Sequence, residues 1–348
     1  MVTHSVGIRV MGGDTVKAIT IDKEKVEVFI KRRASSWIWK IFRFLLIIGI
    51  CYIFLFPVLY MITIAVRPPR AVDDPSSVWI PRQVSLESIQ MAIKLLDYGR
   101  SVTQTLIISL GSTLASLLSC ALVGYGFARF KFRGKNLAFA LLVLTIIVPP
   151  TTLVMPSYLN FRDFDLLALI HLPHDLFFPN APLLIPRVSV KLTDTALTFI
   201  LPSLFATGLR SGLFVFIFRQ FFVGMPKDLE EAARIDGCGY LKTFVRIMLP
   251  LAVPAMVTVA LFSFIWHWND SQLSAMYYDT NMPLSVMLSQ IKAAMQNENI
   301  YNISNNTPDQ IRTYLQAGCL LTILPPLILY IFTQRFFTES VERTGIVG

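Results

Sequence analysis

Six long apolar stretches constrain this chain more than any other feature of its sequence. Each approaches or exceeds the ~20 residues with which a helix crosses a bilayer, and the chain is 54% hydrophobic and only 15% charged. Barrel strands would be about half as long and would alternate apolar with polar residues. The sequence therefore predicts an all-α polytopic membrane protein with six transmembrane helices. The predicted spans cover residues 41–66, 105–127, 137–156, 196–218, 251–268 and 315–333.

Lysine and arginine predict the orientation of these spans. If both termini lie in the cytoplasm, the inner segments carry 19 of these residues and the longer outer segments carry 10. This bias agrees with the positive-inside rule. Attraction to the anionic inner leaflet then explains the formal net charge of +9 better than binding to nucleic acid does. The predicted lipid anchors include Arg129, Lys131, Arg133 and Lys135.

The predicted spans also divide the chain into domains and loops. Residues 1–36 form a cytoplasmic tail, in which the alternating residues 26–30 could make a short strand, and residues 37–348 form the transmembrane domain. The longest loops are an inner one at 219–249 and an outer one at 157–195. No metal site or disulfide is expected, because no third ligand joins the outer-loop histidines and the four cysteines are scattered as packing residues. These residues are His171, His174, Cys51, Cys120, Cys238 and Cys319.

The inner loop predicts two short helices. Pro226 suits the first turn of a helix, and the acidic residues that follow it lie at the positive end of the helix dipole. Ala232 and Ala233 are expected to form a small-residue face that another surface can approach closely. Gly237 should end this helix, because glycine reaches the left-handed conformation without steric cost. A second helical run from about 240 to 248 should end before Pro250, which can open the next span.

One motif in this loop carries a family resemblance. Glu231-Ala232-Ala233 is followed after three intervening residues by Gly237. Nine further residues separate this glycine from Ile247, and Leu249-Pro250 follow after one more intervening residue. This pattern resembles the cytoplasmic coupling loop of permease subunits of ATP-binding-cassette (ABC) importers. The resemblance implies a type I ABC importer permease fold, whose coupling helix seats in a groove of the ATPase subunit. The implied docking residues are Glu231, Ala232, Ala233, Asp236, Gly237, Ile247, Leu249 and Pro250.

The resemblance extends over about residues 37–348 and narrows the family. The segments 125–136, 148–159, 218–222 and 268–270 are similar to those of the smaller permease of maltose-type sugar importers, whereas Cys238 and the long outer loop depart from that pattern. This implies a bacterial or archaeal cell-membrane protein that works with a second permease, two ATPase subunits, an extracytoplasmic solute-binding protein and a sugar. The chain has no phosphate-binding Gly-x-x-x-x-Gly-Lys-Ser/Thr motif. ATP and Mg²⁺ should therefore bind to the ATPase partners, and this chain should not be an enzyme.

Candidates for the solute path lie in the fourth span and at the end of the fifth. A charge within a span is costly and should face a cavity or a partner, which singles out Arg210. The alternative is that glycines on either side of Arg210 break the helix and leave it in a wetter position. Sugars are held by aromatic faces and hydrogen-bonding groups, and a group of such residues lies at the end of the fifth span. The alternative is that this group belongs to an aromatic belt at the membrane surface. Its members are Trp266, Trp268, Asn269 and Asp270.

A second class of function stays open at this point. An ATP-independent secondary transporter or a channel would also be a polytopic helical protein, but such folds usually carry several intramembrane charges or inverted repeats. Only Arg210 is a clear intramembrane charge among the predicted spans, and no repeat is apparent. A membrane-embedded enzyme is disfavoured because the spans contain no constellation of acid, metal ligands or nucleophile.

Overall fold

The computed structural model describes residues 23–69, 83–165, 188–296 and 308–345. Residues 1–60 and 61–348 form two units. The first unit consists of most of α1 (Lys23–Ala65), whose apolar part from Trp37 onward is long enough to cross a membrane. Beyond Arg43 this part is apolar on all sides, as expected of a helix in lipid. Residues 26–30 lie within α1, so the predicted short strand is wrong.

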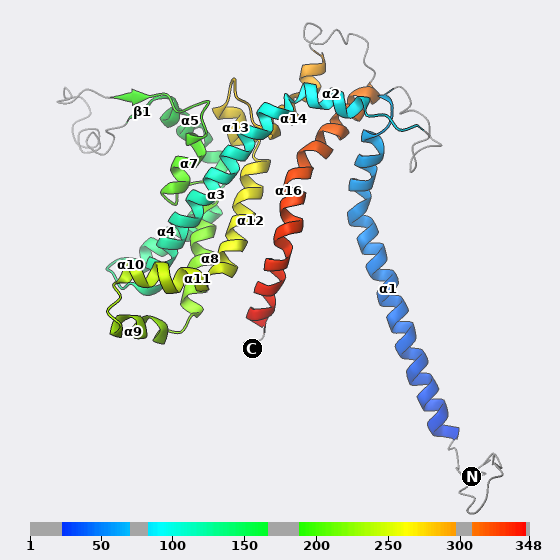
Figure 1. The fold of residues 1–348 in the computed structure, drawn as a ribbon, viewed down its shortest axis with the longest axis horizontal. Helices are drawn as coiled ribbons and strands as arrows, with labels where there is room; N and C mark the ends of the chain where they lie inside the picture. The colour runs from blue at the N-terminus through cyan, green and yellow to red at the C-terminus, as the bar shows by residue number, and fades with distance from the viewer. Residues whose placement is uncertain (1–22, 70–82, 166–187, 297–307, 346–348) are drawn as a thin grey trace, which may run out of the picture. The chain divides into compact units, whose positions relative to one another are not determined.

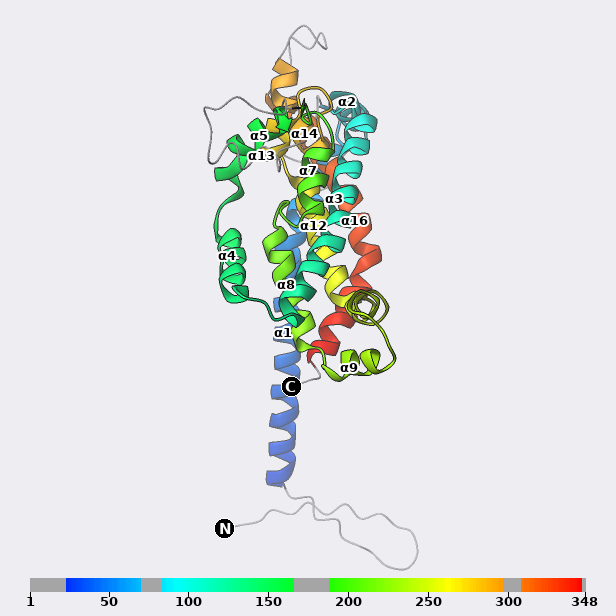
Figure 2. The ribbon, with the colours of Figure 1, turned by 90° about the vertical axis from the view of Figure 1, so that its left-hand side faces the viewer.

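The core of the second unit is built around α3 (Tyr98–Arg129). This helix packs against α7 (Leu197–Leu204), α8 (Ser211–Gly224) and α12 (Val253–Asn269) (Figures 1 and 2). Small residues on α3 permit this close approach. A Cβ at Gly124 would lie 2.6 Å from the Cβ of Phe218 on α8. The fully buried residues of this core include Cys120, Phe214, Phe218, Phe222, Met248 and Val259.

A second cluster joins α12 to the C-terminal helix. The helix α16 (Pro308–Gly345) packs against α2 (Glu87–Leu95), α12 and α14 (Leu284–Gln296). Trp268 and Leu96 are fully buried in this cluster. The indole of Trp268 donates a hydrogen bond to the carbonyl oxygen of Thr322 over 3.1 Å. These contacts connect the N-terminal and C-terminal parts of the second unit.

The described residues contain three continuous helices that are long and apolar enough to span a membrane, or up to five spans if two bent pairs are counted. The bent pairs are Lys135–Ile147 with Pro150–Arg162, at 97°, and Tyr240–Leu251 with Val253–Asn269, at 77°. The helix α8 is apolar but has only 14 residues. The structure confirms a multi-span helical protein, and the count of six spans stays a prediction.

The prediction of one continuous helix at 137–156 is wrong. The helix α4 (Lys135–Ile147) stops at an extended Val148, and Pro149 is extended too. A residue that precedes proline is disfavoured in the helical region, and two consecutive prolines impose this restriction on both Val148 and Pro149. The chain then turns through η3 (Pro150–Leu153) into α5 (Val154–Arg162).

The continuous helix predicted at 196–218 is also broken. The helix α7 ends at Leu204 and α8 begins at Ser211, and between them Ala206 and Arg210 adopt left-handed φ angles of 56° and 60°. A Cβ at Gly208 would lie 2.9 Å from backbone atoms of Ser203, so only glycine fits this turn without a shift. Arg210 therefore lies at a helix break beside Gly208, as the alternative expected, whereas Gly212 lies within α8.

The end of the second unit opposite α9 carries short elements. The strands β1 (Phe164–Asp165) and β2 (Ser189–Val190) pair antiparallel beside α5, and α13 (Gln272–Tyr277) follows α12. The central part of the predicted outer loop, with His171 and His174, lies outside the described residues, as does the beginning of the tail. Figure 1 shows that α13 and α9 lie at opposite ends of this unit.

Candidate functional site: the inner loop and a cavity at the opposite end

The inner loop folds into a series of short helices. It comprises α9 (Asp228–Ile235), α10 (Tyr240–Thr243), the π-helical η4 (Phe244–Met248) and α11 (Leu249–Leu251). The helix α9 begins at Asp228, two residues later than predicted. Its first turn carries the acidic residues that favour the positive end of the helix dipole. The predicted first helix of the loop is therefore present.

Gly237 ends α9 as predicted. Its φ of 75° lies in the left-handed region. The N–H of Gly237 donates to the carbonyl of Arg234 over 3.0 Å, and the N–H of Cys238 donates to the carbonyl of Ala233 over 2.9 Å. This pair of bonds is the Schellman motif, which satisfies carbonyl groups that a helix end would otherwise leave free.

The prediction that both alanines form one open face is wrong. Ala233 is buried and only 3% exposed, whereas Ala232 is exposed. Consecutive residues on a helix point about 100° apart, and here this difference turns Ala233 toward the protein and leaves Ala232 outside. The exposed face instead carries Leu229, Ala232 and Ile235, and Ile235 is 87% exposed. Ile235 was missed, although its spacing of three from Ala232 and six from Leu229 would have placed it there.

Glu230 faces the membrane domain instead of solvent. Its Oε1 lies 3.0 Å from Nε of Arg129, and the two side chains are only 8% and 6% exposed. Arg129 also donates from Nη2 to the carbonyl of Met225 over 2.9 Å. Arg234 is a weaker partner of Glu230 at 4.0 Å. The interpretation of Arg129 as a lipid anchor is therefore wrong, because this side chain is buried against a carboxylate from the inner loop.

Aromatic rings join the loop to the ends of α3 and α8. The ring of Tyr125 lies 5.5 Å from that of Phe222 and 5.0 Å from that of Phe244. Phe130, the residue after α3, contacts Tyr240 edge-on at 5.4 Å. Aromatic pairs in these geometries add to the stabilisation that burial provides. The segment that follows α9 is therefore anchored to the membrane helices.

The remaining motif residues lie at a bend of the chain. The prediction that the second helical run ends before Pro250 is wrong. Pro250 lies within α11, and the 77° bend falls at the buried Ala252. Ile247 and Leu249 are half-buried on either side of the fully buried Met248. These residues direct the chain from the loop into α12.

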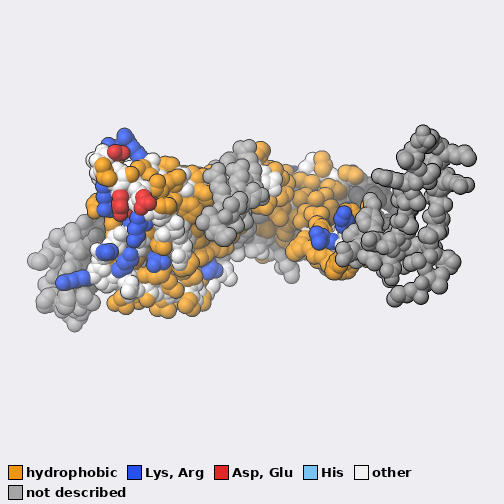
Figure 3. Space-filling view, turned by 90° about the horizontal axis from the view of Figure 1, so that it is seen from below, with side chains coloured by type: hydrophobic (Ala, Val, Ile, Leu, Met, Phe, Trp, Pro, Cys, Tyr) orange, Lys and Arg blue, Asp and Glu red, His pale blue; other side chains and the backbone are white. Residues whose placement is uncertain are grey.

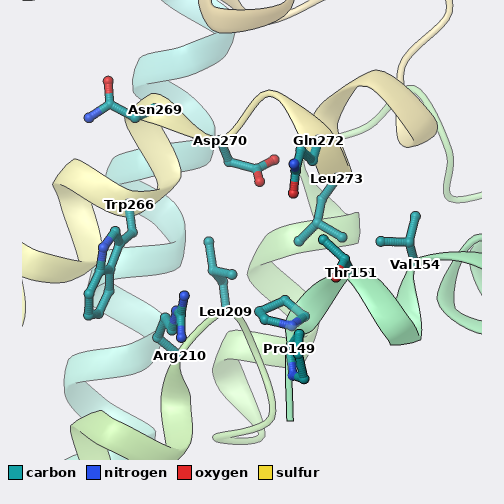
Figure 4. A pocket seen from close by; sticks show the side chains of 11 residues that line it. Pro149, Thr151, Val154, Leu209, Arg210, Trp266, Asn269, Asp270, Gln272 and Leu273 are labelled. Atoms are coloured by element: carbon teal, nitrogen blue, oxygen red, sulfur yellow. The ribbon is translucent and has the colours of Figure 1, made fainter. Parts of the chain in front are cut away.

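A cavity of about 380 Å³ lies near the other end of the unit, where the broken helices meet. It is lined by the turn at Pro149, the break before α8, the end of α12 and the start of α13 (Figure 4). The guanidinium carbon of Arg210 lies 5.5 Å from the centre of the Trp266 ring, a cation–π geometry. Other polar lining residues are Asn269, Asp270 and Gln272.

Four of the five residues predicted for the solute path therefore line one cavity. Trp268 does not, contrary to the prediction, because it is fully buried between α12 and α16 and its indole is hydrogen-bonded there. Trp266 and Trp268 are two residues apart on α12 and point to nearly opposite sides of this helix, so they cannot both face the cavity. Gln272 was missed because it belongs to α13, an element that the sequence did not predict.

The carboxylate of Asp270 is hydrogen-bonded within the turn that follows α12. Its Oδ2 accepts hydrogen bonds from the backbone N–H and the hydroxyl of Ser274, over 2.8 and 2.9 Å. Burial raises the pKa of this carboxyl above its ordinary value. Asp270 thus shapes the turn between α12 and α13 at the cavity wall. Within the described residues, no group of three or more His, Cys, Asp or Glu side chains is placed to hold a metal ion.

Together the broken spans, the cavity and the anchored loop define a multi-pass membrane transport subunit. Residues 120–343 match the family of binding-protein-dependent transport system inner membrane components, and the chain belongs to this family. The predicted class, a permease of an ABC importer and not an enzyme, is confirmed.

Known relatives agree with this assignment. The chain is 28% identical to the arabinooligosaccharide transport permease AraQ of Halalkalibacterium halodurans, over 91% of this chain and 100% of that protein. It is 26% identical to the melibiose/raffinose/stachyose import permease MelC of Bacillus subtilis, over 80% and 87% of the two chains. A bacterial ABC transporter that imports the acidic polysaccharide alginate has a similar fold, with a TM-score of 0.65 and 20% identity over 87% of this chain and 98% of that one.

Proposed function

We propose that this chain is the permease subunit of an ATP-driven sugar importer and pairs with a second permease. Relatives named for the transport of arabinooligosaccharides, of melibiose-type sugars and of diacetylchitobiose favour an oligosaccharide as solute. Lys and Arg side chains gather at the α9 end of the second unit (Figure 3), which supports a cytoplasmic location for that end. Both termini are then cytoplasmic, and a solute-binding protein delivers the sugar from the other side.

The exposure of Ile235 carries the proposal that α9 docks on the ATPase. An apolar side chain that is 87% exposed beside exposed Leu229 and Ala232 forms a small apolar face in water. Such faces mark interaction sites when they are rimmed by polar groups, and here Glu231 and Asp236 supply the rim. The ATPase, which holds ATP and Mg²⁺, receives this face in a groove.

The mechanism that follows is alternating access. ATP closes the two ATPase subunits and draws the docked helices together, and the connected spans then open the solute path outward. Hydrolysis reverses the movement. Movement of the ATPase subunits thus acts on the chain at α9, and it opens the solute path near the other end of the same unit.

The 380 Å³ cavity is proposed as part of the solute path. Trp266 offers an apolar face to a sugar ring, and Asn269 and Gln272 offer amide groups to its hydroxyls. Arg210 can donate several hydrogen bonds in a planar array. This combination of an aromatic face with convergent polar groups suits a carbohydrate better than an apolar solute.

Copurification tests the docking proposal. Ile235→Asp should lose the ATPase subunits from the detergent-extracted complex, because a charge replaces the apolar centre of the docking face. Leu241→Asp is a matched control, since Leu241 is another exposed apolar residue of the loop, on α10 instead of α9. Retention of the ATPases by Ile235→Asp would contradict the proposal.

The same experiment separates the ATP-independent alternative. A secondary transporter or channel should be isolated without ATPase subunits, and its uptake should follow a proton or sodium gradient in the presence of vanadate. Uptake by the proposed importer should stop with vanadate. Gradient-driven uptake in an ATPase-free preparation would replace the importer assignment by the alternative.

A further inference from the structure

The attachment of α9 to the membrane helices depends on few contacts. This eight-residue helix packs mainly on α10, the next element of the loop. Its buried residues are Glu230 and Ala233, and Glu230 reaches Arg129 at the end of α3. Arg129 and Glu230 are far apart in sequence, so their contact connects the loop directly to the second span.

The helix α3 is well placed to distribute a movement. It is a single helix of 32 residues without an internal break, and it packs against α7, α8 and α12. The helix α12 and the break between α7 and α8 contribute residues to the cavity wall. A displacement of Arg129 would therefore reach several elements of that wall through one rigid body.

The ion pair has the properties of a stiff connection. Both side chains are nearly buried, and the oxygen–nitrogen distance is 3.0 Å. Buried ion pairs add little stability over an apolar pair of the same size, but separating the charges leaves each one uncompensated. The bond from Arg129 to the carbonyl of Met225, just after α8, holds the guanidinium in place. Moving α9 away from α3 would thus separate two nearly buried opposite charges.

We propose that the Arg129–Glu230 ion pair is the positioning link through which movement of α9 reaches α3, so that its loss uncouples ATP hydrolysis from transport. This inference rests on the proposed docking of α9. Glu230 is buried and turned away from the exposed face, whereas its neighbour Glu231 is exposed. The two adjacent glutamates therefore have different roles. Glu231 belongs to the polar rim of the docking face, and Glu230 contacts the membrane helix α3 through Arg129.

The test uses the full complex in proteoliposomes with its solute-binding protein. Arg129→Gln and Glu230→Gln should keep the ATPase subunits bound and should lower the solute transported per ATP by about 10-fold, within the range seen for residues of coupling networks. Arg234→Gln is the matched control, because Arg234 is the distant, half-exposed partner of the same carboxylate at 4.0 Å. It should leave the ratio close to that of the unmodified protein. The reversed pair, Arg129→Glu with Glu230→Arg, should recover much of the ratio.

A second variant covers the outcome in which the single substitutions fail to assemble. Arg129→Met with Glu230→Met replaces the ion pair by an apolar pair, which buried sites tolerate. This double variant should assemble and should remain poorly coupled. A normal ratio of solute to ATP in any assembled variant that lacks the ion pair would overturn the inference. Failure of the docking proposal is recognised separately, because the unmodified protein would then copurify without ATPase or Ile235→Asp would retain it.

Discussion

At the scale of single residues, Asp194 joins two segments that are distant in the sequence. Its Oδ1 accepts hydrogen bonds from the backbone N–H groups of Asp279 and Thr280, over 2.8 and 2.9 Å. Burial by itself raises the pKa of Asp194, but these backbone hydrogen bonds outweigh it and leave the pKa below its ordinary value. The ionised carboxylate therefore stabilises the turn that follows α13.

This lowered pKa predicts a pH-dependent loss of stability in Asp194→Asn. A group with a lowered folded-state pKa stabilises the fold fully above its unfolded pKa, and this contribution disappears as the pH falls through the folded pKa. The variant should be less stable by about 1 kcal/mol near pH 7, and the difference should vanish in strong acid. Thermal unfolding in detergent over this pH range measures it. Asp163→Asn is the control, since its side chain is 62% exposed. The same pH profile in both variants would contradict the expectation.

At the scale of elements, α9 depends on its C-terminal cap. The Schellman bonds require a left-handed Gly237, whereas Gly239, two residues on, has an ordinary φ of −70° and opens α10. A Cβ would meet nothing within 4 Å at either position. The two glycines therefore differ in backbone conformation and not in available space.

Alanine at these two positions isolates the cost of the left-handed conformation. Gly237→Ala should destabilise the end of α9 by about 1 kcal/mol, because the left-handed region is strained for a residue with a Cβ. The amides of α9 should then exchange with deuterium about fivefold faster. Gly239→Ala should leave their exchange nearly unchanged. Equal exchange in both variants would show that the cap doesn't stabilise α9.

At the scale of the whole second unit, the cavity exists because several broken elements meet. The turn at Pro149, the left-handed residues before α8 and the ends of α12 and α13 each contribute part of the wall (Figure 4). Continuous helices at 137–156 and 196–218 would have placed regular backbone there. The unit therefore gains polar groups and space near one end, while the loop with α9 occupies the other.

Removing the aromatic face of this cavity should weaken solute handling. Trp266→Ala should raise the sugar concentration needed for half-maximal uptake by about 3- to 10-fold, since a ring contact contributes on the order of 1 kcal/mol. Uptake into proteoliposomes at several sugar concentrations measures this change. Trp39→Ala is the control, because Trp39 is an exposed tryptophan of α1 that does not line the cavity. An unchanged half-maximal concentration for Trp266→Ala would remove the cavity from the solute path.

Local chemistry allowed much of the fold and the loop to be predicted from the sequence. Long apolar stretches show as spans because a bilayer offers no partner for exposed backbone groups. Gly237 was recognised as a helix end because the reason is local to one residue, and the motif from Glu231 to Pro250 identified the family. The break at Pro149 was not predicted, although consecutive prolines were a signal for it, and the break before Ser211 was predicted only as the alternative for Arg210.

The sequence by itself determined the class of this protein, a helical membrane permease with a structured inner loop, because hydropathy, charge bias and a short motif are properties of neighbouring residues. Only the tertiary structure decided which side of α9 is open, which of Trp266 and Trp268 lines the cavity, and that Arg129 pairs with Glu230. These facts depend on contacts between segments about 50 to 100 residues apart, and helix periodicity specifies a residue's face without specifying its neighbour.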